Sequence, residues 1–118
     1  MSEELKADME KYYKQLADLF PIIYKIDPEY AKAFAEFEKQ VEKDGALSAK
    51  TKRLISIALS VAAHCEFCIA FHVKEAINAG ATKQEIMEAA MVVGLMGGGP
   101  ASAYIRYVVD ACDQFSAK

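Results

Sequence analysis

Apolar side chains recur every three to four residues along almost the whole chain, and this spacing leaves little room for anything but helices. No segment alternates apolar and polar residues at period two with strand-forming residues. Between residues 3 and 20 the apolar residues form one helix face: Leu5, Met9, Tyr12, Tyr13, Leu16, Leu19 and Phe20. The sequence therefore predicts an all-α protein.

Helix-capping residues and helix breakers divide this pattern into about six helices. Pro21 ends the first apolar run, and Asp27 with Pro28 is typical of a helix start. A helix over 49–79 would be unusually long for so small a domain, so we expect a break near residues 64–66. The predicted helices span residues 3–20, 28–43, 49 to the break, the break to 79, 82–96 and 100–115.

The length and composition indicate one domain with no nucleic-acid partner. The 118 residues suit a single domain spanning 1–118. Hydrophobic residues make up 53% of the chain, an excess that favours a homo-oligomer as well as a core. The net charge is only −3, which gives no electrostatic reason to expect nucleic acid.

No export or membrane segment is recognisable in the sequence. The first residues, Met1–Lys6, are acidic and lack the apolar core of a secretory signal. The longest uncharged stretch, Ala89–Ile105, contains Gly97–Pro100 and is shorter than the roughly 20 residues of a spanning helix. We therefore expect a cytoplasmic protein with no membrane partner, and structural disulfides are rare in that compartment.

The motif with the clearest chemistry is Cys65-x-x-Cys68-x-x-x-His72. Offsets of three and four residues fall on one helix face, so the two thiols and the imidazole line up one above another. A thiol near a helix N-terminus has its thiolate stabilised by the unpaired backbone N–H groups. His72 can take the proton from Cys68. The layout is that of a dithiol redox centre with a built-in base.

Two other interpretations of the same residues stay open. The cysteines can be inert, because cysteine often behaves as a small buried hydrophobe. Alternatively Cys65, Cys68 and His72 can be three zinc ligands, although a fourth ligand is not obvious: His64 points elsewhere on a helix and Cys112 is distant in sequence. We predict no metal and no cofactor.

The stretch from about residue 47 to 115 resembles the carboxymuconolactone decarboxylase superfamily, in its alkyl hydroperoxidase D-like branch. The matching pieces follow the order of the family. Besides the cysteine motif they are Ser48-Ala49-Lys50-Thr51, Leu54-Ile55 with Ala58, Ala79-Gly80-Ala81-Thr82, Glu85-Ile86 and Gly97-Gly98-Gly99-Pro100.

The resemblance implies an all-helical fold that assembles into trimers or hexamers, and a peroxiredoxin-like antioxidant activity. Cys68 would be the peroxidatic thiolate, Cys65 the resolving cysteine and His72 part of the proton relay. The substrate would be a small peroxide or disulfide. An external dithiol would then restore the reduced pair.

The chain departs from the family pattern at the relay glutamate, whose position is occupied by Arg53. A guanidinium cannot act as a general base. Glu66, inside the motif, is a candidate substitute, and Phe67 stands where the family relay can have a histidine. The alternatives to a peroxidase are therefore a thiol-disulfide reductase, a lactone decarboxylase of the same family, or a non-catalytic metal-binding or assembly protein.

Overall fold

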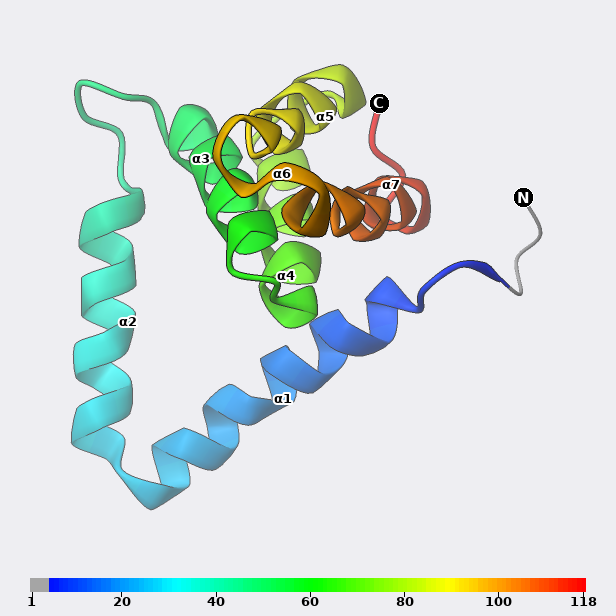
Figure 1. Cartoon of the computed structure of the whole chain (residues 1–118). Coiled ribbons are helices and arrows are strands. Elements are labelled where there is room, and N and C mark those ends of the chain that lie inside the picture. The colour runs from blue at the N-terminus through cyan, green and yellow to red at the C-terminus, as the bar shows by residue number, and fades with distance from the viewer. Residues whose placement is uncertain (1–4) are drawn as a thin grey trace.

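The computed structural model describes residues 5–118, and this range contains seven α-helices and no strand. The helices are α1 (Met9–Ile26), α2 (Pro28–Glu42), α3 (Ala49–Ala62), α4 (Glu66–Asn78), α5 (Lys83–Met91), α6 (Gly94–Ala103) and α7 (Ile105–Gln114) (Figure 1). The predicted all-α class is confirmed. The count exceeds the expected six because the helices predicted over 82–96 and 100–115 are interrupted at residues 92–93 and at Tyr104, and α6 lies between these two breaks.

Helix α1 begins later and ends later than predicted. Of the predicted span, residues 3 and 4 lie outside the described residues, and the helix begins at Met9, where the Asp8 carboxylate accepts a hydrogen bond from the Lys11 N–H (3.1 Å). The predicted end at Pro21 is wrong, since α1 continues to Ile26. Proline removes one backbone donor, and packing of α1 on α2 outweighs this local cost.

A single residue joins α1 to α2. The Asp27 N–H donates to the carbonyl of Ile23 (2.8 Å) and so closes α1. The Asp27 carboxylate accepts a hydrogen bond from the Tyr30 N–H (3.1 Å) and so caps α2, with Pro28 in the first turn. The predicted start of α2 is therefore confirmed.

The predicted break between α3 and α4 is confirmed, and a Schellman turn makes it. His64 has the left-handed φ of 55° at the end of α3. Its N–H donates to Val61 (3.1 Å), and the N–H of Cys65 donates to Ser60 (3.2 Å). This turn places Cys65 directly before the first residue of α4.

The predicted helix bounds in the last third of the chain are confirmed in part. Helix α5 begins after the Thr82 capping box as predicted, but it ends at Met91 rather than Met96. Pro100 lies two residues after a kink at Gly98, in the first turn of the helical segment that follows, as predicted, and that segment is interrupted at Tyr104 before α7. Gly98 has a φ of 59°, which kinks the backbone within α6 at the predicted glycine run. A Cβ on Gly97 would lie only 2.4 Å from Cβ of Ala101. The backbone thus turns more sharply than a side chain would permit.

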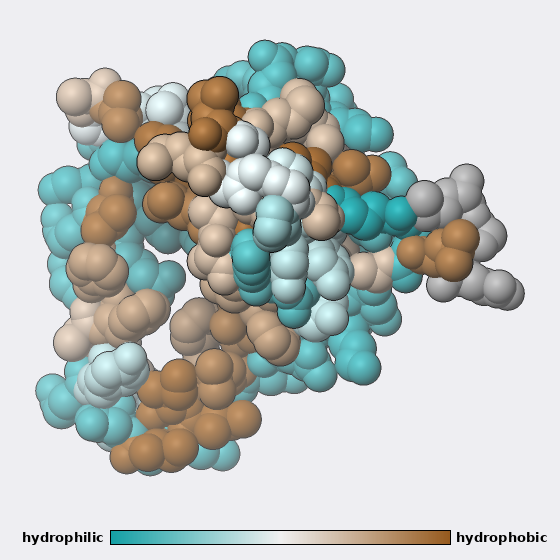
Figure 2. Space-filling view, in the orientation of Figure 1, coloured by the Kyte–Doolittle hydropathy of each residue, from teal (hydrophilic) through white to brown (hydrophobic). Residues whose placement is uncertain are grey.

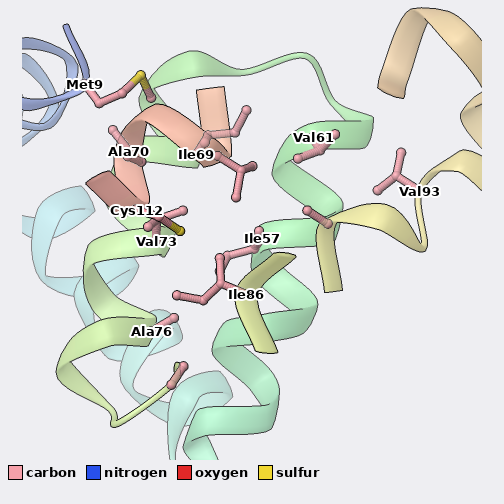
Figure 3. Packing of buried hydrophobic residues seen from close by; sticks show 14 of the residues in the cluster. Met9, Ile57, Val61, Ile69, Ala70, Val73, Ala76, Ile86, Val93 and Cys112 are labelled. Atoms are coloured by element: carbon pink, nitrogen blue, oxygen red, sulfur yellow. The ribbon is translucent and has the colours of Figure 1, made fainter. Parts of the chain in front are cut away.

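The core lies among α3, α4, α5 and α7, with the first turn of α1 closing one side (Figure 3). Its largest fully buried apolar side chains are Met9, Ile57, Ile69, Ile86, Val61, Val73, Val108 and Cys112. The outer part of α1 and all of α2, residues 19–42, extend away from this core and are called the arm below (Figure 1). No residue of α2, which is described throughout, is buried.

None of the helices within residues 5–118 is by itself both long and apolar enough to cross a membrane. Helices α5 and α6 reach the length and hydropathy of a membrane span only when taken together. The two helices are bent by 108° at the break between them. Leu95 and Met96, near this bend, are 86% and 98% exposed.

Candidate active site

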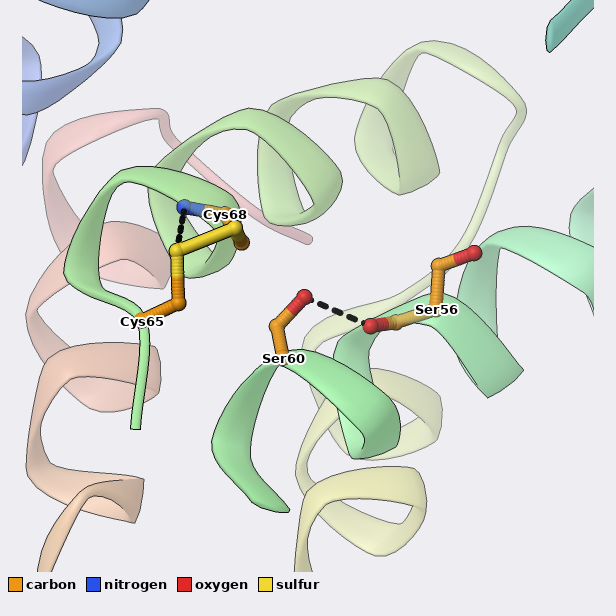
Figure 4. Close-up of a disulfide and its surroundings, with 4 residues drawn as sticks. All are labelled: Ser56, Ser60, Cys65 and Cys68. Atoms are coloured by element: carbon orange, nitrogen blue, oxygen red, sulfur yellow. Dashed lines mark hydrogen bonds between the residues drawn. A yellow bond between two sulfur atoms is a disulfide. The ribbon is translucent and has the colours of Figure 1, made fainter. Parts of the chain in front are cut away.

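The cysteine pair sits at the N-terminus of α4. Cys65 is the N-cap residue, and its sulfur accepts a hydrogen bond from the backbone N–H of Cys68 (3.1 Å). A disulfide joins the two residues, whose Cα atoms are 5.2 Å apart (Figure 4). This separation is ordinary for a disulfide. The expectation that the cysteines lie at a helix start is therefore confirmed.

The turn that carries Cys65 is tied to α3 by the end of that helix. Ser60 is buried, its carbonyl accepts the Cys65 N–H, and its hydroxyl donates to the Ser56 carbonyl (2.7 Å) (Figure 4). Cys65 is thereby held at a fixed place relative to α3. The pair is positioned by backbone contacts of α3 as well as by its own helix.

Cys68 opens onto a groove between the arm and α4. The groove has a volume of about 560 Å³, and Figure 2 shows the molecule hollowed between α2 and the core with apolar residues along the rim. Cys68 and His72 belong to its α4 wall, whereas Cys65 does not line it. The other lining residues are Leu16, Leu19, Phe20, Ile23, Tyr24, Tyr30, Ala31, Phe34, Ala35, Glu38 and Phe71.

His72 lies one helical turn after Cys68 and shares the groove with it. Burial lowers the pKa of His72, and the nearby charge of Arg53 lowers it further, while the charge of Glu42 acts in the opposite direction. Its Nδ1 is buried and has no hydrogen-bond partner among residues 5–118. At neutral pH this imidazole is uncharged and free to accept a proton.

Arg53, at the position of the family's relay glutamate, is engaged by two carboxylates. Its Nη1 lies 2.8 Å from Oε1 of Glu42 on α2, and its Nη2 lies 3.5 Å from Oε2 of Glu75 on α4. Only 15% of the Arg53 side chain is exposed. The guanidinium therefore joins the end of the arm to α3 and α4 and lies close enough to His72 to influence its pKa.

Glu66 and Phe67 do not line the groove. Glu66 is in the first turn of α4, where its charge adds to burial in raising the pKa of Tyr107 on α7. The Phe67 ring packs edge-on against Tyr12 of α1, with centroids 5.2 Å apart. The relay role predicted for Glu66 stays a prediction, with no groove contact to support it.

The third cysteine is part of the core. Cys112 on α7 is 1% exposed, and burial raises the pKa of its thiol to about 11. It is a free thiol that stays protonated at neutral pH. The residues that the structure describes contain no cluster of three or more metal-binding side chains.

Glu38 is a charged residue of the groove that no sequence motif predicts. It lies on α2, four residues after Phe34 and seven after Ala31, and all three line the groove. This spacing places Glu38 on the apolar face of α2, and a carboxylate on such a face is the signal that could have found it. Burial and the charges of Glu42 and Glu75 raise its pKa, against the opposing charge of Arg53.

The fold and the site together define a small helical protein with a thiol pair at a helix N-terminus and an apolar groove in front of it. A crystal structure of a carboxymuconolactone decarboxylase family protein from Legionella pneumophila is similar, with 34% identity and a TM-score of 0.88 over 92% of this chain and 96% of that one. A Thermotoga maritima structure with 24% identity has the same fold, with a TM-score of 0.81 over 91% and 94% of the two chains.

The chain belongs to the carboxymuconolactone decarboxylase family, whose model matches residues 28–111. Two curated relatives carry names that state no activity. Uncharacterized protein 4 in the cox locus of Paracoccus denitrificans is 40% identical over 82 residues, which is 70% of this chain and 74% of that protein. A Cupriavidus necator protein is 30% identical over 117 residues, 99% of this chain and 100% of the relative.

Proposed function

We propose that this protein is a dithiol peroxidase of the alkyl hydroperoxidase D-like type. The observation that carries the proposal is the different placement of the two cysteines: Cys68 lines the groove together with His72, and Cys65 does not. A substrate in the groove meets the sulfur of Cys68, which the family resemblance assigns as peroxidatic. Cys65, three residues away, is within disulfide distance and serves as the resolving cysteine.

The proposed cycle uses Cys68, Cys65 and His72, with a hydroperoxide as oxidant and an external dithiol as reductant. His72 accepts the Cys68 thiol proton, and the thiolate attacks the terminal peroxide oxygen, so that an S–O bond forms and the O–O bond breaks. The leaving alkoxide takes up a proton and departs as an alcohol, while the sulfur is oxidised by two electrons to a sulfenic acid. Cys65 then displaces water and forms the disulfide, and an external dithiol returns two electrons and two protons.

The test is mass analysis of the reduced protein after a brief pulse of stoichiometric cumene hydroperoxide. Wild-type protein should lose two hydrogens, mapped to a link between Cys65 and Cys68. Cys65→Ser should stop at the sulfenic acid, and Cys68→Ser should consume no peroxide. Cys112→Ser is the matched control, because this buried thiol lies in the core and its loss should leave the reaction unchanged. Peroxide consumption by Cys68→Ser at the wild-type rate would overturn the proposal.

Arg53 favours a second candidate, a thiol-disulfide reductase that uses the same pair on a disulfide substrate. With Arg53 paired to Glu42 and Glu75, the relay position offers no carboxylate. Wild-type protein that exchanges with a small aromatic disulfide, yet stays reduced in peroxide, would select this candidate. A lactone decarboxylase, the activity in the family's name, would instead keep its activity after both thiols are alkylated.

We also propose that the protein is a cytoplasmic homo-oligomer, a trimer or hexamer. The support is the number of exposed apolar side chains on the arm and near the α5–α6 bend, including Ile26 at 78%, Phe37 at 62% and Leu95 at 86%. Sedimentation velocity should give a particle several times the chain mass of 13.0 kDa. A monomer at micromolar concentration would refute the oligomer without touching the proposed chemistry.

A further inference from the structure

On the basis of the proposed function, we propose that the groove selects uncharged apolar hydroperoxides and that Glu38 excludes those that carry a carboxylate. Glu38 is the single charged side chain among the described residues that line the groove. It lines the groove from the arm, and Cys68 and His72 line it from α4, so a substrate that reaches the Cys68 sulfur occupies the same cavity as the Glu38 carboxylate.

The groove has the shape and surface of a site for a small apolar molecule. Its volume of about 560 Å³ lies within the usual range of ligand pockets. Apart from Glu38, Cys68, His72 and two tyrosines, its lining is aliphatic or phenylalanine side chains. Transfer of an aromatic or alkyl chain from water to this surface is favourable, whereas transfer of hydrogen peroxide is almost neutral.

The charge around Glu38 has one dominant sign. The charges that act on it come from Glu42 on the same helix, Glu75 on α4 and Arg53 on α3. Together with Glu38 these are three carboxylates and one guanidinium, and Arg53 is already paired with Glu42 and Glu75. His72 does not restore the balance, because its lowered pKa leaves it uncharged. A carboxylate that enters the groove is therefore repelled in a partly desolvated site.

The measurement is the ratio of kcat/KM for methyl linoleate hydroperoxide to that for linoleic acid hydroperoxide, both below their aggregation limits. The two substrates share one chain and differ in one charge. Wild-type protein should prefer the ester by about tenfold or more, the size expected when one unpaired charge must enter such a site. Glu38→Gln should raise kcat/KM for the acid and leave that for the ester nearly unchanged.

Glu36→Gln is the matched control, since it removes the same charge from α2 at an exposed position outside the groove. It should keep the wild-type ratio. Equal kcat/KM values for acid and ester in the wild type, or an unchanged ratio in Glu38→Gln, would overturn the inference. A change in Glu36→Gln as large as in Glu38→Gln would also overturn it, because the effect would then follow net charge and not the groove.

A binding measurement separates this inference from the proposed function. Titration calorimetry with decanol and with decanoate needs no turnover and uses two probes of one chain length. Wild-type protein should bind decanol more tightly, and Glu38→Gln should bring the two affinities together. If no hydroperoxide oxidises Cys68, the proposed function fails while this measurement still decides the selectivity; equal wild-type affinities for the two probes would refute it.

Discussion

Replacing Arg53 with Met tests whether a largely buried ion pair holds the arm in place. Arg53 Nη1 lies 2.8 Å from Glu42 on the arm, and Nη2 lies 3.5 Å from Glu75 on α4. With an effective dielectric constant near 20, the shorter pair alone has about 6 kcal/mol of Coulomb attraction. Desolvation of the charges offsets much of this, and removal of one partner from a buried pair costs about 3–5 kcal/mol.

The loss of unfolding free energy expected for Arg53→Met is smaller, because water reaches part of the cluster that Arg53 forms with Glu42 and Glu75. The side chains of Arg53, Glu42 and Glu75 are 15%, 26% and 26% exposed. We therefore expect Arg53→Met to lower the free energy of unfolding by about 2–3 kcal/mol. In a chain of this length the corresponding fall in Tm is about 8–15 °C.

Urea unfolding followed by circular dichroism measures this loss. All variants must be compared at one protomer concentration, because association of copies would couple to stability. Arg53→Lys is the matched control: a lysine keeps the charge but cannot hold two carboxylates in a planar fork, so it should lose about half as much. A loss below about 0.5 kcal/mol for Arg53→Met would refute the view that this pair holds the arm.

The glycine run, the core and the groove histidine give three further predictions. Gly97→Ala should lower the free energy of unfolding by about 1–3 kcal/mol, because its Cβ would lie 2.4 Å from Cβ of Ala101; Gly99→Ala, with open space around it, is the control, and equal Tm values for the two would contradict the close contact. Ile57→Ala should cost about 2–5 kcal/mol in urea unfolding, since Ile57 is fully buried, and a loss under about 1 kcal/mol would mean that the core is loosely packed there. Stability should fall as the pH drops from about 7 to 5, because the lowered pKa of His72 makes the unfolded chain bind the proton first; His72→Gln should flatten this slope in urea midpoints, and an unchanged slope would assign it to another group.

The sequence was sufficient where a feature depends on neighbouring residues. The start of α2 follows from an Asp-Pro pair, and the cysteines lie at a helix start because a long apolar run had to break near residues 64–66. The same signals failed where distant contacts decide. Pro21 is tolerated inside α1, and the helix predicted over 82–96 is interrupted after Met91.

The groove shows the same limit for the candidate site. Cys68 and His72 share a wall of it, as their spacing on one helix predicts. The partners of Arg53, by contrast, are eleven and twenty-two residues away in sequence, on two other helices. Glu38 reaches the groove only because α2 folds back toward α4. Contacts between side chains on different helices depend on how the helices are arranged, so no local sequence pattern predicts them.

The single-residue junction at Asp27 has a mechanical consequence for the groove. Helix α2 has 15 residues and is thus about 22 Å long, so it acts as a stiff lever with its pivot at Asp27. A change of about 10° in direction at the pivot would displace the far end by about 4 Å, roughly the thickness of an aromatic ring. That far end is where Glu42 meets Arg53. The width of the groove therefore depends on two points, the Asp27 junction and the ion pair between Glu42 and Arg53, more than on packing along α2 between them.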